Sequence, residues 1–197
     1  MKSFDYDLRY FKAGVEELQD YLLSDNMFWS LDAKTEVNEP VFPNLTLGNL
    51  LLAEKRLRAR HLTLEQEAQL GEVLPELERL RSHWQVAWSK KAERSMHNRL
   101  NMWRNFIDEY TKAPEANADR YAYEVQRRVM LELLKTEVDQ IPQAVTELLA
   151  RLDAFLKTFL VSGDFLWEEE LKDGFPKDTY WFLYGRLPQE LKQSGDY

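Results

Sequence analysis

The chain has 197 residues, of which 44% are hydrophobic and 30% are charged, and its formal net charge is -8. This composition is typical of a globular protein with a substantial apolar core, and the aromatic content of 13% excludes a disordered chain. Because the sequence contains no cysteine, it excludes a disulfide scaffold, a cysteine-ligated zinc site, an iron–sulfur cluster and a cysteine nucleophile.

The sequence shows no sign of a membrane segment or a secretory leader. It contains no run of about 18 apolar residues, so we expect no transmembrane helix and no membrane partner. The N-terminal stretch 1–11 has early acidic residues and lacks the apolar centre of a signal peptide. We therefore expect a cytoplasmic protein.

Charge is unevenly distributed along the chain. Residues 1–44 carry 4 basic and 9 acidic side chains, residues 45–112 carry 12 and 9, and residues 113–197 carry 10 and 16. The basic middle and the acidic flanks would most simply neutralise each other within one fold, and the overall negative field weakens attraction to nucleic acid. We predict a helical bundle over residues 1–163 and a C-terminal subdomain, residues 164–197, packed on it.

The N-terminal part predicts a helix followed by a long irregular segment. Apolar residues recur at spacings of three and four from Phe4 to Leu23, which is the pattern of one buried helical face. Residues 25–44 contain Pro40 and Pro43 and keep no period, so we expect an irregular loop there. This loop is either disordered or packed through its apolar residues, which are Phe28, Trp29, Val41 and Phe42.

The central part predicts the longest helix of the chain. Thr46 is a good cap for a helix that ends near His61, and Thr63 with Gln66 resembles a capping box for the next one. We expect Gly71 and Pro75 to interrupt that helix. The sequence after Pro75 has no glycine or proline up to Lys112, which predicts a single helix about 55 Å long with a wide apolar face.

The remaining sequence predicts two more helices and an aromatic end. The helices cover residues 118–138 and the stretch from Pro142 to about residue 160, before Ser162 and Gly163. Residues 165–184 contain seven aromatic residues, with glycines and prolines that divide them into short helices or turns. Strand signals are nearly absent. The expected fold is all-α: an elongated helical bundle built around one long central helix, with an aromatic C-terminal segment.

Motifs for catalysis and metal binding do not stand out. The Glu-x-x-His pairs of di-iron bundles are absent, and His61, His83 and His97 are interpreted as surface histidines. The glycines are too widely spaced for a P-loop or a dinucleotide fingerprint. We assign no catalytic residue, metal ligand or cofactor. An enzyme that uses one histidine and a nearby carboxylate in a pocket between helices stays open as an alternative.

One face of the predicted long helix is basic and carries no acid before Asp108. This basic ridge consists of Arg79, His83, Lys90, Arg94, His97, Asn101 and Arg104. Such a row can dock on an acidic protein surface or contact successive phosphates of a nucleic acid. It can also be a solvated face without a partner, or one neutralised by the acidic run Glu168–Glu170.

The second candidate surface is an aromatic patch formed by Trp167, Phe175, Tyr180, Trp181 and Tyr184. Exposed, it would be an anchor for a partner; we expect it instead to be buried and to cap one end of the bundle. The sequence as a whole favours a non-catalytic interaction or scaffold protein that binds an acidic partner through the basic ridge. Nucleic-acid binding by the same ridge is the first alternative, and an antiparallel homodimer is a further expectation.

Overall fold

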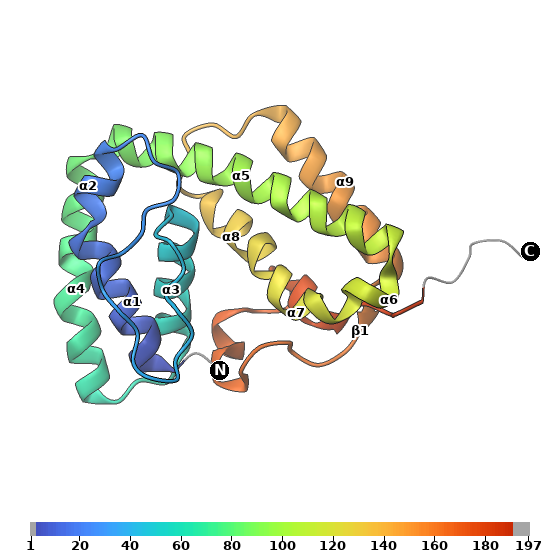
Figure 1. The fold of residues 1–197 in the computed structure, drawn as a ribbon, viewed down its shortest axis with the longest axis horizontal. Coiled ribbons are helices and arrows are strands. Elements are labelled where there is room, and N and C mark those ends of the chain that lie inside the picture. Colours follow the sequence, from blue (N-terminus) through green and yellow to red (C-terminus); the bar gives the residue numbers. More distant parts are fainter. Residues whose placement is uncertain (1–2, 191–197) are drawn as a thin grey trace, which may run out of the picture.

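The computed structural model describes residues 3–190 (Figure 1). The predicted all-α fold is confirmed: helices form nearly all of the regular structure in this part of the chain. One pair of two-residue strands is present within it, where β1 (Val161–Ser162) pairs antiparallel with β2 (Gly185–Arg186). No helix within residues 3–190 is long and apolar enough to cross a membrane.

Four helices form the N-terminal side of the molecule (Figure 1). They are α1 (Phe4–Glu16), α2 (Leu18–Leu23), α3 (Leu47–Ala59) and α4 (Leu64–His83). The predicted caps are confirmed, since Thr46 accepts a hydrogen bond from the backbone N–H of Asn49 and Thr63 forms a complete capping box with Gln66. These side chains satisfy backbone groups that a helix leaves unpaired at its start, and so they fix where α3 and α4 begin.

The helix predicted over residues 4–23 is divided at Glu17, which leaves the helical conformation between α1 and α2. The carboxylate of Glu17 accepts hydrogen bonds from the indole of Trp29, at 2.7 Å, and from the backbone N–H of Asp32, at 2.9 Å. Residues 25–44 are irregular, as predicted, and they are packed rather than loose. Trp29 and Phe42 contact the core, whereas Phe28 and Val41 are exposed. We call residues 25–44 the strap.

The predicted helix from Pro75 to Lys112 is the main correction. Trp84 leaves the helical conformation, with φ -109° and ψ 32°, and separates α4 from α5 (Gln85–Lys112). Figure 1 shows the two helices running in different directions from this point. The physical reason is that each helix buries its apolar side chains against different partners: α4 packs on α1, and α5 packs on α8, α3 and α9.

Pro75 does not start a helix but lies inside α4. Proline removes the hydrogen bond to the residue four positions earlier, here Gly71, and this loss normally breaks a helix. Both residues are exposed on the outer side of α4, so water can satisfy the carbonyl of Gly71. The helix therefore passes through the two residues that we expected to interrupt it.

Helix α5 is the predicted long central helix, with α8 and α9 packed along it (Figure 1). The chain then turns through α6 (Pro114–Asn117) and η1 (Ala118–Arg120). The helix predicted over residues 118–138 is wrong in its bounds, because the structure has α7 (Tyr121–Glu124) and α8 (Gln126–Leu134), separated at Val125. The last helix, α9 (Gln143–Phe159), follows Pro142 as predicted.

The C-terminal segment contains two short 3-10 helices, η2 (Glu169–Gly174) and η3 (Trp181–Leu183). Its buried side chains, including Phe165 and Phe182, belong to the same hydrophobic core as the helices. The hydroxyl of Tyr121 donates a 2.6 Å hydrogen bond to the carbonyl of Phe182, which ties this segment to the bundle. The end of the predicted subdomain, residues 191–197, lies outside the described residues.

Candidate functional site

The bend at Trp84 divides the basic ridge between two helices. Arg79 and His83 lie on α4, and the other five residues lie on α5; all seven are exposed. Arg79 is paired with Glu76 at 2.6 Å, and Arg94 donates a 2.9 Å hydrogen bond to the carbonyl of Asp25. Because α4 and α5 diverge, the seven side chains do not form one straight row, and only the α5 part keeps the predicted spacing.

The acidic run 168–170 does not neutralise the ridge. Glu168 contacts Arg56 at 3.5 Å, Glu170 contacts Arg60 at 2.9 Å, and Glu169 contacts Lys172 at 2.7 Å. The run therefore faces α3 and its own segment, which corrects the interpretation in which it covers the ridge.

The aromatic patch is largely part of the core. Phe175 and Tyr180 are buried, whereas Trp167, Trp181 and Tyr184 are half-buried. The indole of Trp167 donates to the carbonyl of Ala122 at 3.1 Å, which fixes it against α7. The patch is therefore partly buried and packed against the core, and its role as a cap or as an anchor for a partner stays a prediction.

The three histidines lie apart from one another on the surface. His61 is 3.4 Å from Asp173, His97 is 4.0 Å from Glu93, and His83 packs edge-on against Trp84. Within residues 3–190, no group of three or more histidine, aspartate or glutamate side chains is placed to hold a metal ion.

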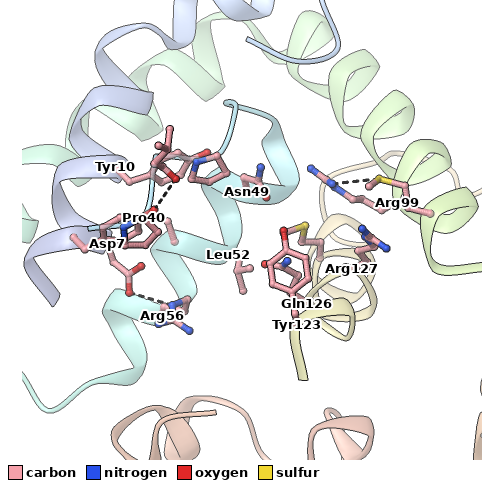
Figure 2. A pocket seen from close by; sticks show the side chains of 16 residues that line it. Asp7, Tyr10, Pro40, Asn49, Leu52, Arg56, Arg99, Tyr123, Gln126 and Arg127 are labelled. Atoms are coloured by element: carbon pink, nitrogen blue, oxygen red, sulfur yellow. Dashed lines mark hydrogen bonds and ion pairs between the residues drawn. The ribbon is translucent and has the colours of Figure 1, made fainter. Parts of the chain in front are cut away.

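A cavity of about 310 Å³ lies where the N-terminal helices meet the central ones. Its walls are formed by α1, α3, α5, α7 and α8, and the strap residues Pro40, Val41 and Pro43 form the remaining side. Figure 2 shows the polar side chains of these elements turned toward a common space. Three arginines line it, Arg56, Arg99 and Arg127, against one acid, Asp7, so its lining carries a net positive charge.

Arg56 forms ion pairs with acidic side chains of the protein itself, Asp7 and Glu168. Its Nε lies 3.0 Å from Asp7, which also contacts Arg60 at 2.8 Å. Burial raises the pKa of Asp7 above its ordinary value, while Arg56 and Arg60 oppose this rise by favouring the carboxylate. This end of the cavity is therefore a closed ion network that joins α1, α3 and the C-terminal segment.

Arg99 is buried without an acid. Only 6% of it is exposed, and no carboxylate within the described chain lies within 4 Å of it. Its Nη2 donates to the hydroxyl of Thr46 at 2.9 Å, and its Nη1 contacts the sulfur of Met102 at 3.6 Å. Its Nε is buried and has no hydrogen-bond partner among residues 3–190. A buried cation without a counter-charge is unfavourable. A buried polar group without a partner is one mark of a place where an ion binds.

Arg127 adds a second positive charge beside Arg99. It pairs with Glu124, a carboxylate that also binds Arg120 at 2.9 Å, so one acid serves two arginines. Burial lowers the pKa of Arg99, and the charge of Arg127 lowers it further. The two guanidinium groups thus repel each other across the cavity, and an anion between them would relieve this repulsion.

The other walls offer hydrogen bonds and apolar contact. Tyr10 on α1 and Tyr123 on α7 line the cavity, as do Asn49 on α3 and Gln126 on α8 (Figure 2). Burial raises the pKa of Tyr10, so its hydroxyl stays protonated, and it donates a long hydrogen bond to the carbonyl of Asn44 at 3.5 Å. The apolar lining comes from residues such as Leu52 and Met130. A cavity of this size, with an apolar wall and a few converging polar groups, has the features of a small-molecule site.

The sequence carries a signal for this cavity that lies outside the predicted basic ridge. At 100° per residue, Arg99 lies about 60° from Trp84, in the middle of the apolar face of the central helix rather than on its polar side. A charged residue on an apolar helical face is rare, because burial of a charge requires compensation. Such a residue is therefore a candidate for a functional role. Lys91 occupies the same face and is also buried, where it donates to the carbonyl of Asn26.

Comparison of the chain with known protein families, curated proteins and solved structures returned no match. The site must therefore be interpreted from its own chemistry.

Proposed function

We propose that this protein binds a small organic anion in the cavity between α1, α3, α5 and α8. The observation that carries the proposal is Arg99, a buried guanidinium that faces the cavity, has no acid partner among the described residues and leaves its Nε without a hydrogen bond. The anionic group of the ligand lies against Arg99 and Arg127, and the apolar wall accommodates its carbon skeleton.

The chemistry of arginine supports an oxyanion as the recognised group. A guanidinium presents its N–H donors in a planar fork that matches the oxygen atoms of a carboxylate or a phosphate. Bonds between charged partners are roughly twice as strong as neutral ones, and burial strengthens them further. Arg99 is held in place by Thr46 and Met102, so little side-chain freedom is lost when the anion binds.

The test is a calorimetric titration with inorganic phosphate and with acetate, which present the two kinds of oxyanion. We expect saturable binding of at least one of them to the wild type and loss of that binding in Arg99→Met. Arg151→Met is the matched control, because Arg151 is an exposed arginine on α9 outside the cavity. Equal binding by wild type and Arg99→Met, or no binding of either oxyanion by the wild type, would refute the proposal.

A second candidate function rests on the α5 part of the basic ridge. Lys90, Arg94, His97, Asn101 and Arg104 are exposed along one helix, and His97 alone among them has an acidic side chain within 4.0 Å in the described chain. We propose an acidic protein surface as the partner, because the overall charge of -8 disfavours the dense negative charge of a nucleic acid more strongly than that of a protein surface.

The double charge reversal Lys90→Glu with Arg94→Glu tests this second candidate. A protein that co-purifies with the wild type and is lost from the reversed variant supports it. Binding of an oligonucleotide that weakens steeply with salt and requires the same two residues would replace it by the nucleic-acid alternative. The molar mass of the wild type and of the charge-reversed variant, measured by light scattering, shows whether the partner is a second copy of this chain.

A further inference from the structure

A second hollow adjoins the cavity. This hollow has a volume of about 290 Å³ and shares part of its lining with the cavity. The shared residues are Pro40, Leu52, Arg56, Tyr123 and Gln126. Trp167 and Glu168 line the second hollow but not the first. The two spaces are therefore neighbours, one lined by Arg99 and the other by Trp167.

Tyr123 stands where the two spaces join. Figure 2 shows its ring between Leu52 and Arg127, close to Gln126. The side chain lies on the short helix α7 and is 66% exposed, although it is a large aromatic residue next to a core that buries most of its aromatic rings. An exposed aromatic ring at the rim of a cationic cavity is a platform on which a flat ligand can stack.

Polar groups near Tyr123 have the hydrogen-bonding capacity to bind the polar edge of a heteroaromatic ring. Gln126 offers both a donor and an acceptor, and Glu168 offers carboxylate oxygens at the half-buried end of the second hollow. Glu168 is already held by Arg56 at 3.5 Å, which fixes its position. A ring that carries an amino group and ring nitrogens could hydrogen-bond to both residues.

We infer that the anion is the phosphate of a nucleoside monophosphate or a similar aromatic phosphate monoester. Its phosphate lies at Arg99 and Arg127, its sugar passes Leu52, and its base stacks on Tyr123 and points toward Glu168. This inference rests on the proposed function, since it names the ligand class of the same cavity.

The number of acceptor oxygens at the cationic end favours phosphate over carboxylate. Arg99 has no acid within 4 Å among the described residues, and Arg127 pairs with Glu124. Arg120 contacts both Glu124, at 2.9 Å, and Glu109, at 2.8 Å, so these three arginines exceed the two acids by one positive charge. A phosphate monoester offers three strong acceptor oxygens, whereas a carboxylate offers two. The phosphate can therefore accept hydrogen bonds from Arg99 and Arg127 together.

The test compares four probes by calorimetry: adenosine monophosphate, ribose 5-phosphate, inorganic phosphate and adenosine. We expect adenosine monophosphate to bind at least about tenfold more tightly than ribose 5-phosphate, because base stacking on an aromatic ring contributes a factor of that order. The variant Tyr123→Ala should remove most of this difference and leave the affinity for ribose 5-phosphate unchanged. Tyr123→Phe should retain the difference. Because Tyr123 is exposed, these variants are not expected to disturb folding.

The outcomes separate the two proposals. If ribose 5-phosphate and adenosine monophosphate bind equally well to the wild type, the ligand class is overturned and anion binding stands. If Tyr123→Ala weakens both to the same extent, the stacking role of Tyr123 is overturned. If none of the three phosphates binds but acetate does in the titration that tests the proposed function, the anion is a carboxylate and the ligand class is overturned. Failure of every anion overturns the proposed function itself.

Discussion

The two ends of the cavity contain the same residue type in opposite electrostatic situations. Arg56 and Arg99 are both buried, at 7% and 6% exposure, and both line the same space. Arg56 contacts Asp7 and Glu168, and Arg99 has no acid within 4 Å in the described part of the chain.

This difference separates a structural role from a binding role. A buried charge that is paired within the protein contributes to the fold and offers little to a ligand, whereas a buried charge that lacks a partner destabilises the protein until a ligand neutralises it. The Arg56 end should therefore determine stability, and the Arg99 end should determine affinity. This contrast fails if the two ends respond alike to substitution and to ligand.

The largest effect is expected from Arg56→Met. It removes the contacts of Arg56 with Asp7 and Glu168 and leaves these acids with less positive charge beside them, so we expect the free energy of unfolding to fall by about 3 kcal/mol. Urea denaturation followed by circular dichroism measures this loss. A change smaller than about 1 kcal/mol would mean that the Asp7 network does not hold the fold together.

The next effect is stabilisation by the ligand. An anion at about 100 times its dissociation constant should raise the free energy of unfolding by about 2.7 kcal/mol, because it binds the folded state alone. Thermal unfolding with and without adenosine monophosphate measures the shift. The same shift in Arg99→Met would show that the stabilisation does not come from the cavity.

A smaller effect of opposite sign to that of Arg56→Met is expected from Arg99→Met. Methionine fills a similar volume without the uncompensated charge, so the unliganded variant should be more stable than the wild type by about 1 kcal/mol. Denaturation in a buffer free of phosphate and carboxylate measures it. If Arg99→Met destabilises as strongly as Arg56→Met, the contrast between the two ends is lost.

The smallest effect at neutral pH concerns Tyr6, which lines the Arg56 end. Burial raises the pKa of Tyr6 to about 12 from its ordinary value of 10.0. The unfolded chain therefore loses this proton first, and the contribution of Tyr6 to stability is complete below pH 10 and declines as the pH rises through about 12. Tyr6→Phe should change little at pH 7 and should reduce the loss of stability between pH 10 and 12. Denaturation midpoints of the wild type and of Tyr6→Phe, measured at pH 7, pH 10 and pH 12, test this.

Local signals in the sequence predicted the elements whose ends depend on nearby side chains. Thr46 and Thr63 begin α3 and α4 as expected, because capping involves residues only three positions apart. The bend at Trp84 was missed, because it depends on which distant helices cover α4 and α5. The passage of α4 through Pro75 was missed for a related reason: a helix tolerates proline where water can reach the unpaired carbonyl, and exposure follows from tertiary packing.

The candidate site could be predicted only in part. The position of Arg99 on the apolar face of the central helix is readable from the spacing and indicates a buried charge. The difference between Arg99 and Arg56 is not readable, since their acids come from distant segments: Asp7 lies on α1, and Glu168 lies beyond α9. The exposed residues of the basic ridge were easier to recognise because a polar helical face is a local pattern.

The nuclear magnetic resonance signals of the arginine Nε–H groups, followed during a titration with adenosine monophosphate, report on both ends of the cavity at once. The Nε–H of Arg99 has no hydrogen-bond partner within the described residues, whereas that of Arg56 is bonded to Asp7 at 3.0 Å. We predict a large, saturable shift of the Arg99 signal, identified by its loss in Arg99→Lys, and little change in the Arg56 signal. An Arg99 signal that stays unchanged at millimolar ligand would contradict the assignment of Arg99 as the anion-binding group.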